Sequence, residues 1–366
     1  MAVPSSYLSP FKAAHHLDDI AALRDGRPIA PRNIQVDLEA FCPHSCEFCS
    51  YRNVGWQQYE KAPMQFEEPA ARTEQTGMAR DIALALPRQM YMAGIPSIEI
   101  TGGGESLVYP YIGEFLDECG EYGIEIGLVT NGVALRDSVL AHVRRDKLKW
   151  VRFSVDAITD DVYSEVHRTP RVAFGTLMRN IKRLIDWRDP AVTLVGVSFV
   201  ITQHNYLQIA KAAAFFKELG VDSVRYTYTF DPGGEGRLSK AQHIFASDLL
   251  RMAKFRETPT FRVFTVDRLE AYSRPNDDFS MCGYQHFVWA IGYNGIVYPC
   301  CIMKYHTGYE IGDLSKQTLK DIVLSEHRRN FAAHLNVMDC KSCYLRDKNK
   351  FIEYLLDKNP AHVNFV

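Results

Sequence analysis

The sequence lacks the features that would direct it into a membrane, along a secretory route or onto nucleic acid. No apolar run approaches the roughly 20 residues that a helix needs to cross a bilayer. The opening residues 1–7 have neither the basic nor the apolar segment of a signal peptide. A formal net charge of −2 provides no global basic field to attract nucleic acid. We therefore expect a cytoplasmic protein without membrane or nucleic-acid partners.

Internal repeats and low-complexity segments are also lacking, so the fold is predicted from hydrophobic periodicity. Apolar runs typical of strands alternate with amphipathic runs typical of helices from about residue 33 onward. The predicted strands are Ile34–Glu39, Ser97–Thr101, Ile124–Thr130, Trp150–Asp156, Thr193–Thr202 and Ser223–Phe230. The predicted helices between them are Glu74–Met92, Tyr111–Tyr122, Asp137–Arg145, Phe174–Trp187 and Tyr206–Leu219.

Strands separated by helices pair in parallel through crossovers, which predicts an α/β fold. Six strands are too few for a closed eight-stranded barrel, so we expect an open, partial (β/α)6 TIM-like barrel. An irregular lead-in would occupy residues 1–32, the barrel residues 33–260, and a small α+β extension residues 261–366. In that extension, Asn-Gly at 294–295 between apolar runs predicts a β-hairpin.

Nine cysteines in a reducing compartment indicate metal or redox chemistry rather than disulfides. Cys42, Cys46 and Cys49 form a C-x3-C-x2-C motif directly after the first predicted strand. Three thiolates at this spacing can hold a four-iron cluster and leave one iron without a protein ligand. The alternative is a zinc site that takes its fourth ligand from elsewhere in the chain.

A second group of cysteines lies in the C-terminal extension. Four thiolates from this group could fully coordinate a further cluster or a zinc ion. Cys300 and Cys301 are adjacent, and we choose Cys300 as the ligand because Gly295 precedes it by five residues on the hairpin. The predicted ligands are Cys282, Cys300, Cys340 and Cys343.

Over residues 33–230 the chain resembles the radical S-adenosylmethionine (SAM) superfamily. Its signature is the same cysteine motif at the end of the first strand of a partial (β/α)6 barrel. The resemblance implies a 4Fe–4S cluster whose open iron chelates SAM. It also implies reductive cleavage of SAM to a 5′-deoxyadenosyl radical, which abstracts a hydrogen atom from the substrate.

The resemblance also assigns residues to the SAM site. Gly102, Gly103, Gly104 and Glu105 match the GGEP motif, with Ser106 in the place of proline, and Glu105 would accept hydrogen bonds from the SAM ammonium. Period-2 alternation puts Arg152, Ser154 and Asp156 on one strand face. The further expected cofactor contacts are Phe48 near the adenine, Ser154, Asp156, Asn131, Arg168 and Ile201.

Residues 260–346 resemble the twitch domain, a shorter relative of the SPASM domain that carries an auxiliary iron–sulfur cluster. The shared features are Gly295-x4-Cys300, Cys282 and the C-x2-C pair at 340 and 343. Two clusters suggest an electron path, with the auxiliary cluster as electron acceptor in a dehydrogenation. Flavodoxin or ferredoxin would supply the first electron.

Candidate catalytic residues are expected at the inner face of the barrel. Arg152 would bind an anion or an oxygen of the substrate, and strand parity adds Tyr226, Tyr228 and Asp231. Cys301 is the spare thiol near the clusters and the candidate hydrogen-atom donor for an epimerase.

The substrate is expected to be a small metabolite such as a sugar, an aminocyclitol or a nucleotide. The reason is that the lead-in of about 32 residues is too short for a leader-binding domain. A peptide, with epimerisation or C–C or C–S bond formation, is the alternative. The competing hypothesis from a different functional class is a non-enzymatic zinc or iron–sulfur protein.

Overall fold

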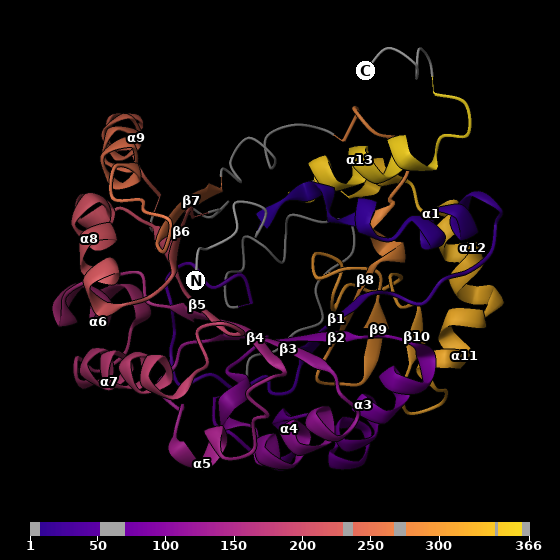
Figure 1. Cartoon of the computed structure of the whole chain (residues 1–366), viewed down its shortest axis with the longest axis horizontal. Helices are drawn as coiled ribbons and strands as arrows, with labels where there is room; N and C mark the ends of the chain where they lie inside the picture. The colour runs from indigo at the N-terminus through magenta and orange to yellow at the C-terminus, as the bar shows by residue number, and fades with distance from the viewer. Residues whose placement is uncertain (1–7, 52–69, 230–236, 267–275, 341–342, 361–366) are drawn as a thin grey trace.

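One mixed β-sheet organises the computed structural model, which describes residues 8–51, 70–229, 237–266, 276–340 and 343–360 (Figure 1). The strand order is β10-β9-β8-β1-β2-β3-β4-β5-β6-β7. The strands are β1 (Asn33–Asp37), β2 (Ser97–Thr101), β3 (Glu125–Thr130), β4 (Leu148–Ser154), β5 (Leu194–Ile201), β6 (Ser223–Tyr228), β7 (Arg262–Val266), β8 (Val288–Ile291), β9 (Ile296–Tyr298) and β10 (Gly312–Asp313).

The strands from β8 through β1 to β7 pair in parallel, which confirms the predicted α/β fold. The six strands of the predicted partial barrel are present as β1 to β6, and in the described residues β8 and β7 extend this parallel run at its two ends. β8 belongs to the predicted hairpin, but it also pairs with β1 in the register Asn33↔Val288. β7 begins just past residue 260 and pairs with β6. The domain division at 260 stays a prediction.

Helices cover the outer face of the sheet, and their sequences explain why (Figure 1). In α8, Ile209, Ala212, Ala213 and Phe216 are buried at the i, i+3, i+4, i+7 spacing of one helix face. Gly220 ends this helix in the left-handed conformation, with φ 93°. The outer helices are α3 (Arg80–Ala93), α4 (Ile112–Glu121), α5 (Asp137–Leu140), α6 (Asp160–His167), α7 (Val172–Trp187), α8 (Ile209–Leu219) and α9 (Lys240–Lys254).

Three local predictions are wrong. The lead-in is not wholly irregular, because it forms the 3-10 helix η2 (Pro10–His15) and α1 (Leu17–Arg24). The helix predicted over 137–145 shortens to the single turn of α5. The sequence analysis missed α6, which carries His167 at its C-terminal end.

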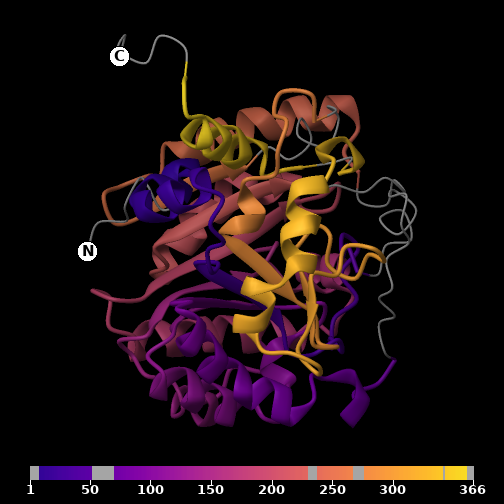
Figure 2. The same ribbon diagram turned by 90° about the vertical axis from the view of Figure 1, so that its right-hand side faces the viewer.

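The C-terminal helices return to the barrel beside the lead-in (Figure 2). α13 (Arg346–Leu356) packs on η2 and α1, and the rings of Phe11 and Phe351 meet edge-on with centroids 4.9 Å apart. α11 (Leu319–Leu324) packs on α3, and α12 (Glu326–His334) follows it. Each helix in the described part of the chain is too short or too polar to cross a bilayer.

Candidate active site

The cysteine loop, residues 38–49, follows β1 and lies against the glycine-rich turn after β2. Gly104 N donates a hydrogen bond to Glu39 O at 3.0 Å. A Cβ atom at Gly104 would lie 2.3 Å from Phe41 O, so only glycine permits this close approach. The turn and the loop therefore form one surface.

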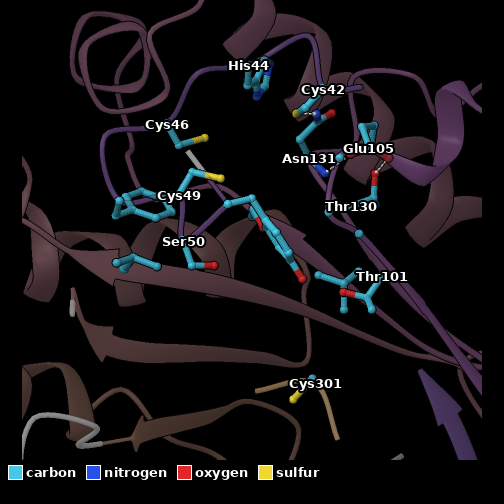
Figure 3. Close-up of a pocket in the computed structure, with 18 of the residues that line it drawn as sticks. Cys42, His44, Cys46, Cys49, Ser50, Thr101, Glu105, Thr130, Asn131 and Cys301 are labelled. Carbon is cyan, nitrogen blue, oxygen red and sulfur yellow. Dashed lines mark hydrogen bonds between the residues drawn. The ribbon is translucent and has the colours of Figure 1, made fainter. Parts of the chain in front are cut away.

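The thiols of Cys42, Cys46 and Cys49 are directed toward a common space, as Figure 3 shows. Burial raises the pKa of Cys46, and the neighbouring Cys49 and Cys42 raise it further. A buried thiol beside two others is stable as a thiolate only when a positive charge lies next to it. Soft thiolate donors of this kind fit an iron–sulfur cluster.

Glu105 is held at the edge of the same space by donors from the chain. Its Oε1 accepts from Thr130 Oγ1 at 2.6 Å and from Leu107 N at 3.1 Å, and its Oε2 accepts from Asn131 N at 2.7 Å. Burial raises the pKa of this carboxyl, although the three donors oppose the shift. Asn131 Nδ2 also lies 3.8 Å from Cys42 Sγ, which links the end of β3 to the cysteine loop.

Asp156 does not line the cavity that was expected to hold SAM. It is fully buried, its Oδ1 accepts from Val200 N, and its Oδ2 lies 3.1 Å from His167 Nε2. The strand alternation fails here because β4 ends at Ser154 and Asp156 has a φ of +58°. Asp156 therefore supports His167, a residue that the sequence analysis missed.

The other expected cofactor contacts divide into two groups. Ile201 is buried in the core and the neighbouring Val200 faces the cavity, while Arg168 is exposed and lies outside the cavity lining. The residues that do line the cavity are Phe48, Gly102, Gly103, Gly104, Glu105, Asn131 and Ser154.

The inward direction expected of the β6 tyrosines is wrong. The Tyr226 hydroxyl donates to Ile209 O at 2.8 Å within the helix layer. The Tyr228 hydroxyl lies 3.2 Å from Ser247 Oγ of α9, although other atoms of Tyr228 line the cavity. Thr227 and Thr229 face the cavity instead. Asp231 lies outside the described residues.

Arg152 lines the cavity as expected. Its guanidinium lies 3.7 Å from Glu99 Oε1, beyond hydrogen-bond distance. Gln35 Nε2 donates to the other oxygen of Glu99 at 2.9 Å. Glu99 therefore orients two neighbours that share the cavity wall with it.

The four predicted auxiliary ligands gather in a second cluster of buried and half-buried side chains. Burial raises the pKa of Cys300, and Cys301, Cys282 and Cys340 raise it further. Burial also raises the pKa of Cys343 to about 12, and Asn349 Nδ2 donates to its sulfur at 3.5 Å. A mutually close set of thiols at one place fits a fully coordinated cluster.

Cys301 faces the opposite way from Cys300. Its sulfur lies 2.9 Å from the Tyr344 hydroxyl, and both residues line the cavity. Figure 3 shows Cys301 across the cavity from Cys42, Cys46 and Cys49. A spare thiol next to the auxiliary cysteines therefore faces the predicted SAM site.

A buried ion pair joins the two halves of the site, and no sequence pattern predicts it. Lys304 Nζ lies 2.6 Å from Asp37 Oδ1, and the Tyr305 hydroxyl donates to Asp37 Oδ2 at 2.8 Å. Burial disfavours the ammonium, but Asp37 and Tyr51 raise the pKa of Lys304 overall. The loop after β9 is thereby fixed to the end of β1.

These walls enclose a cavity of about 430 Å³. One wall is the cysteine loop with the glycine-rich turn, and the opposite wall is the loop that carries Cys301 and Lys304. This cavity has three features that fit an iron–sulfur cluster with a bound SAM. They are the clustered thiols, the close backbone contact that only glycine permits at Gly104, and the buried carboxylate of Glu105.

Fold and site together define an α/β-barrel metalloenzyme built to hold iron–sulfur clusters. Residues 39–216 match the radical SAM superfamily model, and residues 282–344 match the SPASM iron–sulfur cluster-binding domain. The chain therefore carries a radical SAM domain followed by a SPASM domain and is a radical SAM enzyme. Its cofactors are 4Fe–4S clusters and SAM. The competing hypothesis of a non-enzymatic metalloprotein does not fit these two domains.

Individual relatives are distant. The chain is 24% identical to the tungsten-containing aldehyde ferredoxin oxidoreductase cofactor-modifying protein of Pyrococcus furiosus, over 69% of this chain and 74% of that protein. It is 29% identical to the subtilosin biosynthesis protein AlbA of Bacillus subtilis, over 39% of this chain but only 31% of AlbA. The structure of Streptococcus suis SuiB bound to precursor peptide SuiA superposes with a TM-score of 0.60, at 17% identity over 97% of this chain and 82% of that one.

Proposed function

We propose that this enzyme oxidises a substrate held between its SAM site and its auxiliary cluster. One observation carries the proposal: a single cavity is bounded by Cys42, Cys46 and Cys49 on one wall and by Cys301 on the other. A substrate in this cavity lies beside a hydrogen-atom acceptor and near an electron acceptor.

When bound, the cluster and SAM supply a 5′-deoxyadenosyl radical that takes a hydrogen atom from the substrate. The residues of the chain bind and orient SAM and the substrate. Glu105, Asn131, Ser154 and Phe48 would hold SAM, and Arg152 would donate hydrogen bonds to an oxygen of the substrate. Cys282, Cys300, Cys340 and Cys343 would hold the auxiliary cluster that accepts the remaining electron, while the second proton leaves the substrate to water.

The substrate that we propose is a peptide. AlbA acts in the biosynthesis of the bacteriocin subtilosin, and SuiB binds a precursor peptide, which supports this choice over the small metabolite expected from the sequence. The short lead-in, on which that expectation rested, is a weaker argument than these two similarities. Tyr228 and Cys301 stay candidate catalytic residues, and both line the cavity.

We further propose a cytoplasmic location and a flavodoxin or ferredoxin as electron donor. The chain has nine cysteines, and cysteines that serve as cluster ligands rather than in disulfides are typical of a reducing compartment.

An anaerobic labelling experiment tests the proposed function. The reconstituted enzyme is incubated with reductant, SAM and deuterium-labelled cell extract that has been separated into a peptide fraction and a small-metabolite fraction. We expect deuterium in 5′-deoxyadenosine only with the peptide fraction, and a product that has lost two electrons. Transfer from the small-metabolite fraction alone, or a redox-neutral product, would contradict the proposal.

A further inference from the structure

Two buried side chains, Asp156 and His167, form a line that ends at Cys46, a half-buried cysteine of the SAM-site motif. His167 Nδ1 lies 3.1 Å from Cys46 Sγ. On the other side of the ring, His167 Nε2 lies 3.0 Å from Val155 O and 3.1 Å from Asp156 Oδ2. The His167 and Asp156 side chains are 1% and 0% exposed, so water does not compete for these contacts.

The ring of His167 is fixed in its orientation by aromatic neighbours. Tyr163 stacks on it with centroids 4.2 Å apart, and the rings of His44 and Phe48 meet it edge-on at 5.4 Å and 6.0 Å. A rotation of the ring would bring it into these side chains. Nδ1 is therefore held toward Cys46 by packing as well as by hydrogen bonding.

Asp156 is fixed just as firmly. Its side chain accepts from Val200 N, and its carbonyl oxygen accepts from Asn205 Nδ2 at 2.8 Å. Its φ of +58° is uncommon for a residue other than glycine, and the surrounding hydrogen bonds stabilise it. This arrangement directs the carboxylate at His167 rather than into the cavity.

The chemistry of the partners fixes the direction of the hydrogen bonds. Val155 O is an acceptor, so Nε2–H donates to it, and the Asp156 carboxylate lies beside Nε2 at ion-pair distance. A cysteine that ligates iron is a thiolate and also accepts, so Nδ1–H donates to Cys46.

We propose that His167 is a positioning residue that donates a hydrogen bond to the Cys46 sulfur and raises the reduction potential of the SAM-binding cluster. Hydrogen bonds to ligand sulfurs stabilise the added electron, because they offset negative charge on the sulfur. Asp156 holds His167 in this orientation. The inference goes beyond the proposed reaction and rests on Cys46 as a cluster ligand.

Redox titration of the two clusters by EPR tests the proposal without any substrate. In His167→Leu, the midpoint potential of the SAM-binding cluster should move to a more negative value, while that of the auxiliary cluster should not move. In His167→Asn, the amide nitrogen takes the place of Nδ1, so most of the wild-type potential should return. Pulsed EPR in D2O should detect an exchangeable proton near the cluster in wild type and His167→Asn, and not in His167→Leu.

An unchanged midpoint potential of the auxiliary cluster would show that the fold of the variant is intact. If His167→Leu assembles no SAM-binding cluster, His167→Gln serves as the donor-free variant instead. The glutamine amide nitrogen reaches the place of Nε2 rather than that of Nδ1, so Cys46 lacks this donor. Equal potentials in wild type and the donor-free variant, or equal shifts in the donor-free variant and His167→Asn, would overturn the proposal.

Two controls separate this inference from the proposed function. His142 lies 2.7 Å from Asp117, and this histidine–aspartate contact is outside the cavity lining. His142→Leu removes the contact and should leave both midpoint potentials unchanged. A wild-type protein that binds no iron at Cys42, Cys46 and Cys49 would refute the proposed function before any His167 variant is made.

Discussion

At the scale of single residues, adjacent cysteines have different surroundings. Cys300 turns toward Cys282 and Cys340 in a buried cluster, whereas Cys301 faces the cavity and contacts Tyr344. The sequence motif favoured Cys300 because of its distance from Gly295, and its placement among the other thiols supports this choice. The assignment of the ligand still needs a direct test.

Replacing each of the two cysteines in turn provides that test. Cys300→Ala should lower the iron content from roughly eight to roughly four per chain, because one four-iron cluster loses a ligand. Cys301→Ala should keep both clusters, since Cys301 is the spare thiol. Iron analysis and the cluster absorbance of anaerobically purified protein measure both effects. Loss of iron in Cys301→Ala alone would assign the ligand to Cys301.

At the scale of elements, a buried contact attaches α12 to η6 (Tyr284–His286) at the base of the hairpin. Arg328 donates to His286 Nδ1 at 3.2 Å, and its guanidinium lies 5.5 Å from the ring centroid of Trp289. Burial and the neighbouring Arg328 lower the pKa of His286 to about 4. A neutral histidine is therefore part of this junction.

This junction makes stability depend on pH in a defined direction. The pKa of His286 is lower in the folded protein than its ordinary value of 6.5, so the unfolded chain binds more protons between pH 6.5 and pH 4. Stability should fall by up to about 2 kcal/mol from pH 7 to pH 5 through this group alone. Urea unfolding of wild type and His286→Gln at both pH values measures it, and His286→Gln should lose less stability. Equal losses in the two proteins would contradict the prediction.

Element prediction from the sequence succeeded where burial is regular and failed at the ends of elements. β2 has the bounds that were predicted for it, because its apolar run stops at the glycine-rich turn. On β6, the hydroxyls of Tyr226 and Tyr228 contact the helices, and the threonines face the cavity. The alternation of residues along the strand could not predict this, because either set could have been the inner one. α6 escaped prediction because its exposed face is charged and its apolar positions are few.

At the scale of the whole molecule, the Lys304–Asp37 pair connects the loop of the SPASM region to the first barrel strand. The two side chains are 1% and 0% exposed, so the pair is fully desolvated. Breaking such a pair leaves one buried charge without its partner, which costs more than the pair itself contributes.

Lys304→Met should therefore destabilise the protein by about 3–5 kcal/mol. The double variant Lys304→Met/Asp37→Asn should recover most of this loss, because no lone charge remains. Lys182→Met removes an exposed ion pair with Asp186 and should cost less than about 1 kcal/mol. Urea unfolding of the cluster-loaded protein provides the measurement. A double variant as unstable as Lys304→Met would show that the lone charge is not the cause.

The sequence alone determined the α/β class, the two cysteine sets and the radical SAM resemblance, because periodicity and cysteine spacing are local properties of the chain. Tertiary structure alone decided that β8 pairs with β1, that Asp156 supports His167 instead of facing SAM, and that Lys304 meets Asp37. Each of these contacts joins residues whose proximity depends on how distant segments pack, and no local pattern encodes that packing.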